Sequence, residues 1–320
     1  MRPLGVGVLG ARSFVATRAV IPAILQSEAT RLVAVASRGG PVPAELDPFD
    51  VGTYEAVISH PEVEAVYLPL PNGLHREWTE QAVAAGRHVL CEKPLATRPE
   101  DAAAMFQGAA AAGVLLAEAW MTPFQPRWRH AVDMAAGGEL GRVHHVRSVF
   151  TFTIAAEHAG NYRWDQGQGG GALLDVGLYC LGPAVALWGA EPVSVAAAAR
   201  LGPTGVDTTT AFWLDWGEGR SATGVGSFVL PERQLLEIEG TDGRLVIDDR
   251  PHTGGPGAAG ARLVRPDGSS MELTLPDPDP YERMVSAFAR AVRGDAAWPR
   301  PAAEVLAMLQ LVELVRTASQ

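Results

Sequence analysis

The sequence predicts an α/β protein of two domains, with a parallel sheet first and a largely antiparallel sheet after it. Up to residue 120, short apolar runs alternate with helix-like segments, a pattern typical of βαβ units. From residue 192 to 276, strand-like runs follow one another without helices between them, which favours antiparallel pairing. The length of 320 residues agrees, because one domain typically holds about 100–200 residues.

The first domain is expected to contain five strands, at 4–10, 31–37, 63–71, 88–94 and 114–120. Helices are expected between them, at 16–27, 53–58, 75–86 and 99–113. Right-handed crossovers make such strands parallel, so their carboxyl ends share one edge of the sheet, where ligands bind in doubly wound folds.

The second domain is expected to begin with a helix at 123–141 and a strand at 143–154, and to carry an apolar helix at 173–188. Further strands are expected at 192–201, 208–216, 221–230, 234–249, 261–266 and 270–276, and two helices finish the chain. We therefore predict domains at 1–120 and 121–320, with the last helix able to pack back on the first domain.

Composition excludes several classes of function. Lys and Arg total 26 against 36 Asp and Glu, and the net charge of −10 disfavours binding to nucleic acid or to anionic membranes. Cys91 and Cys180 lie in apolar segments, which indicates core thiols in a reducing compartment. We see no signal peptide, no uninterrupted apolar run near ~18 residues and no metal-ligand spacing. We expect a cytoplasmic protein with a small-molecule substrate.

The first strand ends in a glycine turn that leads into a helix. Such a turn presents unpaired backbone N–H groups to a phosphate. Gly10 and Ala11 fit the start of the dinucleotide pattern G-x-G-x-x-G, but Arg12 stands where the second glycine is usual. Arg12 could pair with phosphate instead; the alternative is an ordinary turn between strand and helix.

The second strand ends in Ser37 and Arg38, where an NAD-preferring site usually has an acidic residue for the ribose hydroxyl. A hydroxyl and a guanidinium suit a 2′-phosphate. This favours NADP as cofactor, with NAD as the alternative. A solvated surface arginine remains the simpler interpretation of Arg38.

Lys93 follows the fourth strand at the ligand edge, and Asn72 follows the third. Pro71 and Pro94 restrict the backbone beside them. A lysine in this place can hold and polarise a carbonyl or hydroxyl oxygen of a substrate.

A second cluster lies at 161–182. Asp175 and Tyr179 are four residues apart, hence on one face of a helix, and the phenol can donate or accept a proton. A helix-start acid and a core tyrosine remain the alternative. Tyr162 and Trp164 could line a sugar ring or simply pack in the core.

Together these motifs resemble the family of glucose–fructose oxidoreductase, inositol dehydrogenase and rhizopine-catabolism proteins (Gfo/Idh/MocA). The matching stretches, from residue 4 to about 190, are GVLGA, VIPAI, VAVASR, VEAVYLPLPNGLH, HVLCEKPLA, AEAW, GELGRVHHV and GGGALLDVGLYCLG. The resemblance implies a Rossmann dinucleotide-binding domain, then an α+β domain with a large, mostly antiparallel open sheet whose free face makes a dimer contact.

The resemblance also implies roles for single residues. Lys93 would belong to the catalytic pair, Tyr179 would occupy the proton-transfer position, and Asp175 would be its helix neighbour near the substrate. Arg163 would match a substrate-side position, beside Tyr162 and Trp164. The places expected to contact the cofactor are Gly10, Ala11, Arg12, Ser37, Arg38, Pro71, Asn72, His75, Glu92, Lys93 and Pro94.

We therefore predict an NADP-dependent oxidoreductase that moves a hydride between nicotinamide and a secondary alcohol or ketone of a sugar, sugar nucleotide or cyclic polyol. A tyrosine at the proton-transfer position is typical of dihydrodiol dehydrogenases, xylose-type dehydrogenases and deoxysugar ketoreductases. The alternatives are a sensor that binds NAD(P) without turnover and a dehydrogenase of non-sugar cyclic diols. Arg12 and the short, proline-rich segment 39–52 depart from the family pattern.

Overall fold

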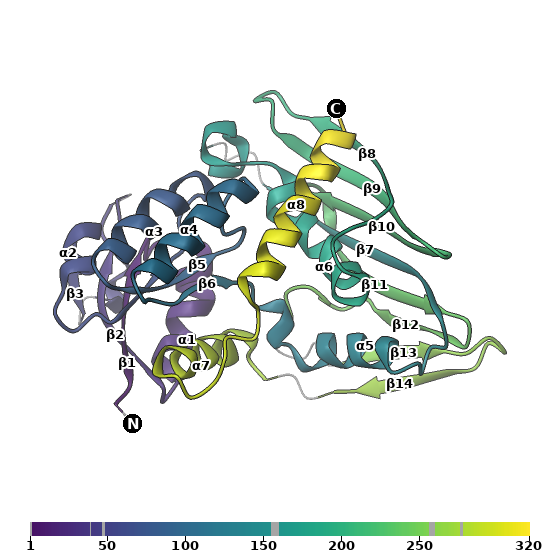
Figure 1. Ribbon diagram of the computed structural model, residues 1–320, viewed down its shortest axis with the longest axis horizontal. Helices are drawn as coiled ribbons and strands as arrows, with labels where there is room; N and C mark the ends of the chain where they lie inside the picture. Colours follow the sequence, from purple (N-terminus) through teal and green to yellow (C-terminus); the bar gives the residue numbers. More distant parts are fainter. Residues whose placement is uncertain (1, 39, 47–48, 155–159, 256–259, 276–277) are drawn as a thin grey trace. The chain divides into compact units, whose positions relative to one another are not determined.

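The computed structural model describes residues 2–38, 40–46, 49–154, 160–255, 260–275 and 278–320 (Figure 1). The chain divides into two compact units. Unit 1 comprises Met1–Met121 and Pro280–Leu306, and unit 2 comprises Thr122–Asp279 and Ala307–Gln320. The sequence pattern assigned Pro280–Leu306 to the second domain, whereas its contacts group it with the first.

Unit 1 is built on a parallel sheet of six strands in the order β3-β2-β1-β4-β5-β6. This is the doubly wound Rossmann order, as the resemblance implied. The strands are β1 (Leu4–Leu9), β2 (Thr30–Ala36), β3 (Asp50–Gly52), β4 (Ala65–Leu68), β5 (His88–Glu92) and β6 (Leu116–Ala119). Strand β3 lies inside the short segment 39–52, where the sequence predicted no strand.

Helices cover both faces of this sheet, as Figure 1 shows: α2, α3 and α4 lie on one face, and α1 and α7 lie on the other. Their bounds are η1 (Ala16–Val20), α1 (Ile21–Gln26), α2 (Tyr54–Ser59), α3 (His75–Ala84), α4 (Pro99–Ala111) and α7 (Pro280–Arg293), with short turns η2 (Ala44–Leu46) and η3 (Asn72–Leu74). Helix α2 begins where the Thr53 side chain accepts a hydrogen bond from the Ala56 N–H, at 3.2 Å.

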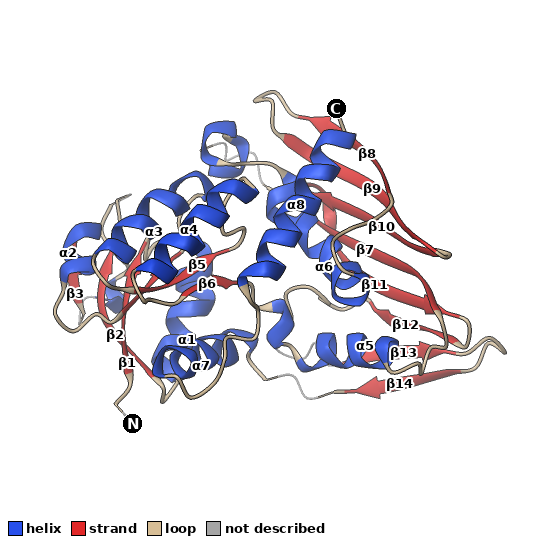
Figure 2. Cartoon of the chain, in the orientation of Figure 1, coloured by secondary structure: helices blue, strands red, loops and turns tan. Residues whose placement is uncertain are grey.

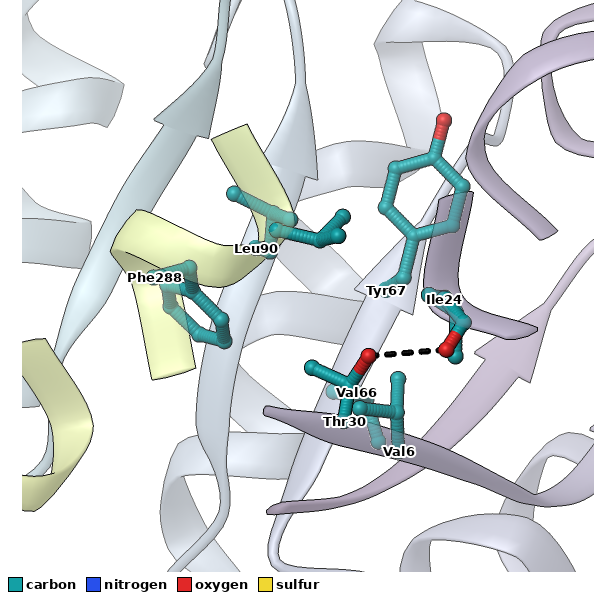
Figure 3. Close-up of a pocket in the computed structure, with 8 residues that line it drawn as sticks. Val6, Ile24, Thr30, Val66, Tyr67, Leu90 and Phe288 are labelled. Atoms are coloured by element: carbon teal, nitrogen blue, oxygen red, sulfur yellow. Dashed lines mark hydrogen bonds between the residues drawn. The ribbon is translucent and has the colours of Figure 1, made fainter. Parts of the chain in front are cut away.

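A small apolar cavity of about 10 Å³ marks where α1 and α7 meet the sheet (Figure 3). Its lining residues are Val6, Ile24, Thr30, Val66, Tyr67, Leu90, Val285 and Phe288. The Thr30 hydroxyl is satisfied by the Ile24 carbonyl, at 2.8 Å. A void of this size, without free polar partners, is a packing defect rather than a binding site. It shows that α7 closes the core of unit 1.

Unit 2 contains an eight-stranded sheet in the order β14-β13-β12-β11-β7-β10-β9-β8, drawn in red in Figure 2. In the described residues β7 and β10 pair in parallel and the other neighbours are antiparallel, which confirms a mostly antiparallel open sheet. The strands are β7 (Val143–Thr153), β8 (Ser194–Leu201), β9 (Asp207–Gly217), β10 (Arg220–Ser227), β11 (Val229–Gly240), β12 (Gly243–Ile247), β13 (Gly260–Val264) and β14 (Ser270–Thr274).

One face of the unit 2 sheet packs on helices and the other is open. The helices are η4 (Thr122–Phe124), α5 (Pro126–Ala136), η6 (Tyr162–Trp164), η7 (Gln166–Gln168), η8 (Leu173–Gly177) and α6 (Leu178–Trp188); α8 (Ala302–Ala318) ends the chain. Along β9, Phe212 and Leu214 are buried, whereas Trp213 between them is 41% exposed. This alternation places Trp213 on the open face.

The helical segment Gln166–Trp188 is long and apolar enough, by length and mean hydropathy, to span a membrane, although Asp175 interrupts its apolar run. Within its most apolar window, however, 78% is buried inside the structure. We interpret it as the core helix of unit 2, because its apolar surface is already covered by protein.

Candidate active site: the nucleotide-binding half

The glycine turn after β1 has the backbone that its sequence suggested. Gly10 has φ +102°, and the N–H groups of Gly10 and Ala11 both donate to the Ala36 carbonyl, at 2.8 and 2.9 Å. A Cβ at Gly10 would lie 2.8 Å from Leu70 Cδ2. The backbone conformation therefore favours glycine there, and an added Cβ would also displace the Leu70 side chain. The helix that follows begins as one π-helical turn, η1.

Arg12 is exposed. Its guanidinium lies against Gly40, in the loop that follows β2, so close that a Cβ at Gly40 would overlap it. Ser37, at the start of the same loop, is half-buried, and Arg38 is exposed. Two guanidinium groups and a hydroxyl therefore lie around the carboxyl end of β2.

Two aromatic rings hold Arg38 in place. Its guanidinium carbon lies 4.5 Å from the centre of the Trp78 ring and 4.8 Å from that of Tyr54. Trp78 itself is fully buried. Such cation–π contacts each contribute about 0.5–1 kcal/mol at exposed sites, so Arg38 is preorganised rather than freely solvated.

Lys93 directly follows β5, at the carboxyl edge of the sheet, and is the only lysine in the chain. The Lys93–Pro94 peptide is cis. The buried Glu92 carboxylate accepts the Lys93 N–H at 3.2 Å through Oε2 and the Tyr67 hydroxyl at 2.8 Å through Oε1. The backbone at Lys93 is thus tied to the preceding side chain.

His75 is fully buried and joins the two loops that carry Asn72 and Lys93. Its Nδ1 lies 2.9 Å from the Pro94 carbonyl oxygen, and its Nε2 lies 2.9 Å from that of Leu70. Burial lowers the pKa of His75. The geometry makes His75 a brace between loops; Asn72 beside it is also buried, and Pro71 is half-buried.

Candidate active site: the tyrosine-bearing half

In unit 2, Arg163 and Asp175 form a two-pronged ion pair. Arg163 Nε lies 2.6 Å from Asp175 Oδ2, and Arg163 Nη2 lies 3.0 Å from Oδ1. The Asp175 side chain is only 5% exposed. Burial acts against the charge on Arg163, but the Asp175 carboxylate prevails and raises the pKa of Arg163. The two residues predicted near the substrate are therefore partners of each other.

Tyr179 lies in α6, one turn beyond Asp175, and belongs to a cluster of three rings. Its ring meets Phe150 edge-on, with 5.4 Å between centres, and lies 6.2 Å from His252. His252 stacks on Phe150 at 5.6 Å. Burial lowers the pKa of His252 to about 4, so the imidazole is neutral at pH 7. No sequence motif pointed to His252, which lies in a turn far along the chain.

Tyr162 and Trp164 flank Arg163 on η6, and both are half-buried. The Arg163 guanidinium lies 5.0 Å from the Tyr162 ring centre. Trp164 meets Phe228 edge-on at 4.7 Å, so part of its ring packs in the unit 2 core. A sugar-stacking role for either ring stays a prediction.

The structure thus gathers the predicted residues into two groups, one in each unit. The cofactor group lies at the carboxyl ends of β1, β2, β4 and β5, and the Arg163, Asp175 and Tyr179 group lies around the start of α6. Over the described parts of the chain, no cluster of three His, Cys, Asp or Glu side chains could hold a metal ion. The Gly10 turn and the guanidinium of Arg38 at the end of β2 fit a phosphorylated dinucleotide in place and chemistry.

Comparisons with known proteins agree with this reading of both units. Residues 4–119 match the model of an oxidoreductase family with an NAD-binding Rossmann fold, and residues 128–246 match the GFO/IDH/MocA C-terminal domain. A D-xylose 1-dehydrogenase (NADP(+)) of Haloferax volcanii is 38% identical, over 89% of this chain and 88% of its own length. A dTDP-3,4-didehydro-2,6-dideoxy-alpha-D-glucose 3-reductase of Streptomyces violaceoruber is 35% identical, over 100% and 96%.

A solved structure has the same fold along the whole chain. It is a 3-ketoreductase from Actinomadura kijaniata in complex with NADP and TDP-benzene, 30% identical, with a TM-score of 0.92 over 99% of this chain and 98% of that one. The family matches, the identity along nearly the full length and the sheet order of both units lead to one conclusion. The chain is a member of the Gfo/Idh/MocA family of oxidoreductases.

Proposed function

We propose that the protein is an NADP-dependent oxidoreductase that acts on a secondary alcohol or ketone of a sugar, sugar nucleotide or cyclic polyol. The observation that carries the proposal is Lys93, which is fixed at the carboxyl edge of a nucleotide-binding sheet by buried side chains. The relatives support it, since they are named as an NADP-linked xylose dehydrogenase and as reductases of a dTDP-linked ketosugar.

The residues of unit 1 would hold the cofactor, which gives or takes the hydride. The pyrophosphate would lie beside the turn at Gly10, where the missing side chain permits close approach; the N–H groups of Gly10 and Ala11 are already engaged by the Ala36 carbonyl. Ser37 and Arg38 would bind the 2′-phosphate, since Arg38 is already held between Tyr54 and Trp78. This arrangement favours NADP over NAD.

The remaining roles divide between Lys93 and unit 2. Lys93 would hold the reacting oxygen of the substrate. Tyr179 would transfer the proton, donating it in reduction and accepting it in oxidation. Asp175 would keep Arg163 oriented toward the substrate side, because both oxygens of its carboxylate are engaged by the guanidinium.

The test is turnover with a panel of aldoses, dTDP-linked ketosugars and cyclic diols, followed by the absorbance of NADPH and NADH at 340 nm. Tyr179→Phe removes the proton-transfer group and should lower kcat by about 10²–10⁴-fold while NADP affinity stays nearly unchanged. Full turnover in Tyr179→Phe would refute the role of this tyrosine. Tight NADP binding without turnover on any substrate would indicate a sensor, and activity on diols alone would indicate a different substrate class.

We also propose that the protein is cytoplasmic and that two or more copies associate through the open face of the unit 2 sheet. The exposed Trp213 supports this, since a large aromatic side chain on a sheet surface favours burial against a partner. Light scattering should show an oligomer that Trp213→Glu dissociates. A wild-type protein that stays monomeric at high concentration would refute the association.

A further inference from the structure

We propose that Glu118 and Arg300 are positioning residues for Lys93, and that their buried ion pair sets the course of the loop 93–95. This inference rests on the proposed function, in which Lys93 holds the reacting oxygen. Neither residue is expected to touch substrate or cofactor. Both belong to unit 1.

The loop is held by side chains at three successive residues. Glu92 accepts the N–H of Lys93, His75 contacts the carbonyl of Pro94, and Glu118 accepts the N–H of Leu95 at 2.8 Å. Glu118 lies in β6, where it stands opposite Cys91 in the register of β5. One carboxylate from the neighbouring strand therefore fixes Leu95, the last residue of the loop 93–95.

That carboxylate is buried and depends on a partner. The Glu118 side chain is 4% exposed and its other oxygen, Oε2, pairs with the guanidinium of Arg300, which is 5% exposed. Arg300 also lies over the ring of Trp120, 4.4 Å from its centre. A buried carboxylate without a cation would become protonated, and a charged acceptor binds an N–H more strongly than a neutral one. Arg300 thus keeps Glu118 in the form that holds the loop.

Arg300 comes from a part of the chain far from Lys93 in sequence. The family matches cover residues 4–119 and 128–246, and Arg300 lies beyond both. It is contributed by Pro280–Leu306, the late segment that joins unit 1. Arg300, from the late part of the chain, would thereby fix the backbone that follows Lys93.

A matched pair elsewhere in unit 1 provides the control. Glu64 accepts the Gly5 N–H at 3.0 Å and pairs with Arg293, with 2.8 Å between Oε1 and Nη1. The arrangement is the same carboxylate between a backbone N–H and an arginine. It lies at the amino-terminal end of β1 and β4, the edge opposite to Lys93, and is more exposed.

The experiment compares Glu118→Leu and Arg300→Met with Glu64→Leu and Arg293→Met in the full-length protein. We expect the first two to lower kcat at least tenfold, with the NADP dissociation constant changed less than threefold, and the control pair to leave kcat per folded molecule unchanged. The double variant Glu118→Gln/Arg300→Met buries no charge and keeps an acceptor for Leu95, so it should recover most of the kcat. Equal kcat in loop and control variants would overturn the inference.

A second measurement does not need turnover. Because Lys93 is the only lysine, reductive ¹³C-methylation labels its side chain and otherwise only the chain terminus. The Lys93 methyl resonance should move in Glu118→Leu and Arg300→Met and stay in place in the control variants. Unmoved resonances would overturn the inference, whereas an inactive wild type with the expected shifts would overturn the proposed function alone. If Arg300→Met does not fold, Glu118→Leu carries the measurement: its Lys93 resonance should still move, whereas the double variant, which keeps an acceptor for Leu95, should leave the resonance near its wild-type position.

Discussion

Replacing Gly171 by alanine should disrupt the segment that carries Asp175 and Tyr179. Gly171 has φ +116°, a backbone conformation that favours glycine. A Cβ there would overlap Oδ1 of Asp207, well inside van der Waals contact. The other oxygen of Asp207 accepts the Leu173 N–H at 2.7 Å and so holds the first residue of η8.

The cost has two parts. An alanine at this φ is strained by about 1–2 kcal/mol. Moving Asp207 weakens its hydrogen bonds to Leu173 and to the Thr210 hydroxyl, which is also 2.7 Å away, and each bond to a charged group contributes about 1.5–3 kcal/mol. If one of the two is lost, the free energy of unfolding of unit 2 should fall by about 2.5–5 kcal/mol.

Guanidinium unfolding followed by far-ultraviolet circular dichroism measures this loss. The control is Gly138→Ala, because Gly138 has a comparable φ of +84° but nothing within 4 Å of the added carbon. The control should lose only the strain, about 1–2 kcal/mol. Equal losses in the two variants would refute the role assigned to Asp207.

Three further predictions concern buried groups. Arg163→Met should lower the free energy of unfolding by about 3–5 kcal/mol, because it leaves the Asp175 carboxylate buried and unpaired. In the same unfolding assay, the double variant Arg163→Met/Asp175→Leu should recover much of this loss, and no recovery would contradict the pairing. Burial lowers the pKa of His252 from 6.5 to about 4, so its contribution to the free energy of unfolding is complete above pH 6.5. As the pH falls from 6.5 through 4, the protein should lose about 3 kcal/mol of this free energy. Unfolding curves of His252→Phe at pH 7 and 4.5 should lack this dependence. Burial raises the pKa of the Cys180 thiol to about 12, and it also raises the pKa of the Cys91 thiol. Neither thiol should therefore react with Ellman's reagent at pH 8 until the protein is unfolded. A rapid reaction of the native protein would contradict this prediction.

The strands of both sheets could be predicted because hydrophobic periodicity is a local property of the sequence. The five expected strands of unit 1 correspond to β1, β2, β4, β5 and β6, and the helix-free series of strands from residue 192 correctly indicated antiparallel pairing. Strand β3 was missed, because it has only three residues in a proline-rich segment and is defined by its pairing with β2. The position of Lys93 after β5 followed from the same local pattern.

Contacts between distant parts of the chain could not be predicted. Nothing near His252 signals its contact with Phe150 and Tyr179, which lie 102 and 73 residues earlier. Likewise, no spacing rule links Arg300 to Glu118. Arg163 was expected to face a substrate. Its ion pair with Asp175 could not be predicted, because it depends on the turn before η8, which brings the two side chains together.

Helix α7 has a consequence for how the protein is made. Val285 and Phe288, both on α7, complete the wall of the cavity beneath β1, β4 and β5. During translation, all six strands of that sheet leave the ribosome long before α7 does. Until α7 is synthesised, the apolar face of the sheet that α7 covers stays exposed to solvent. A gene fragment that stops at Met121 should therefore yield an aggregating product, and an isolated cofactor-binding module would need residues 280–306 fused back to it.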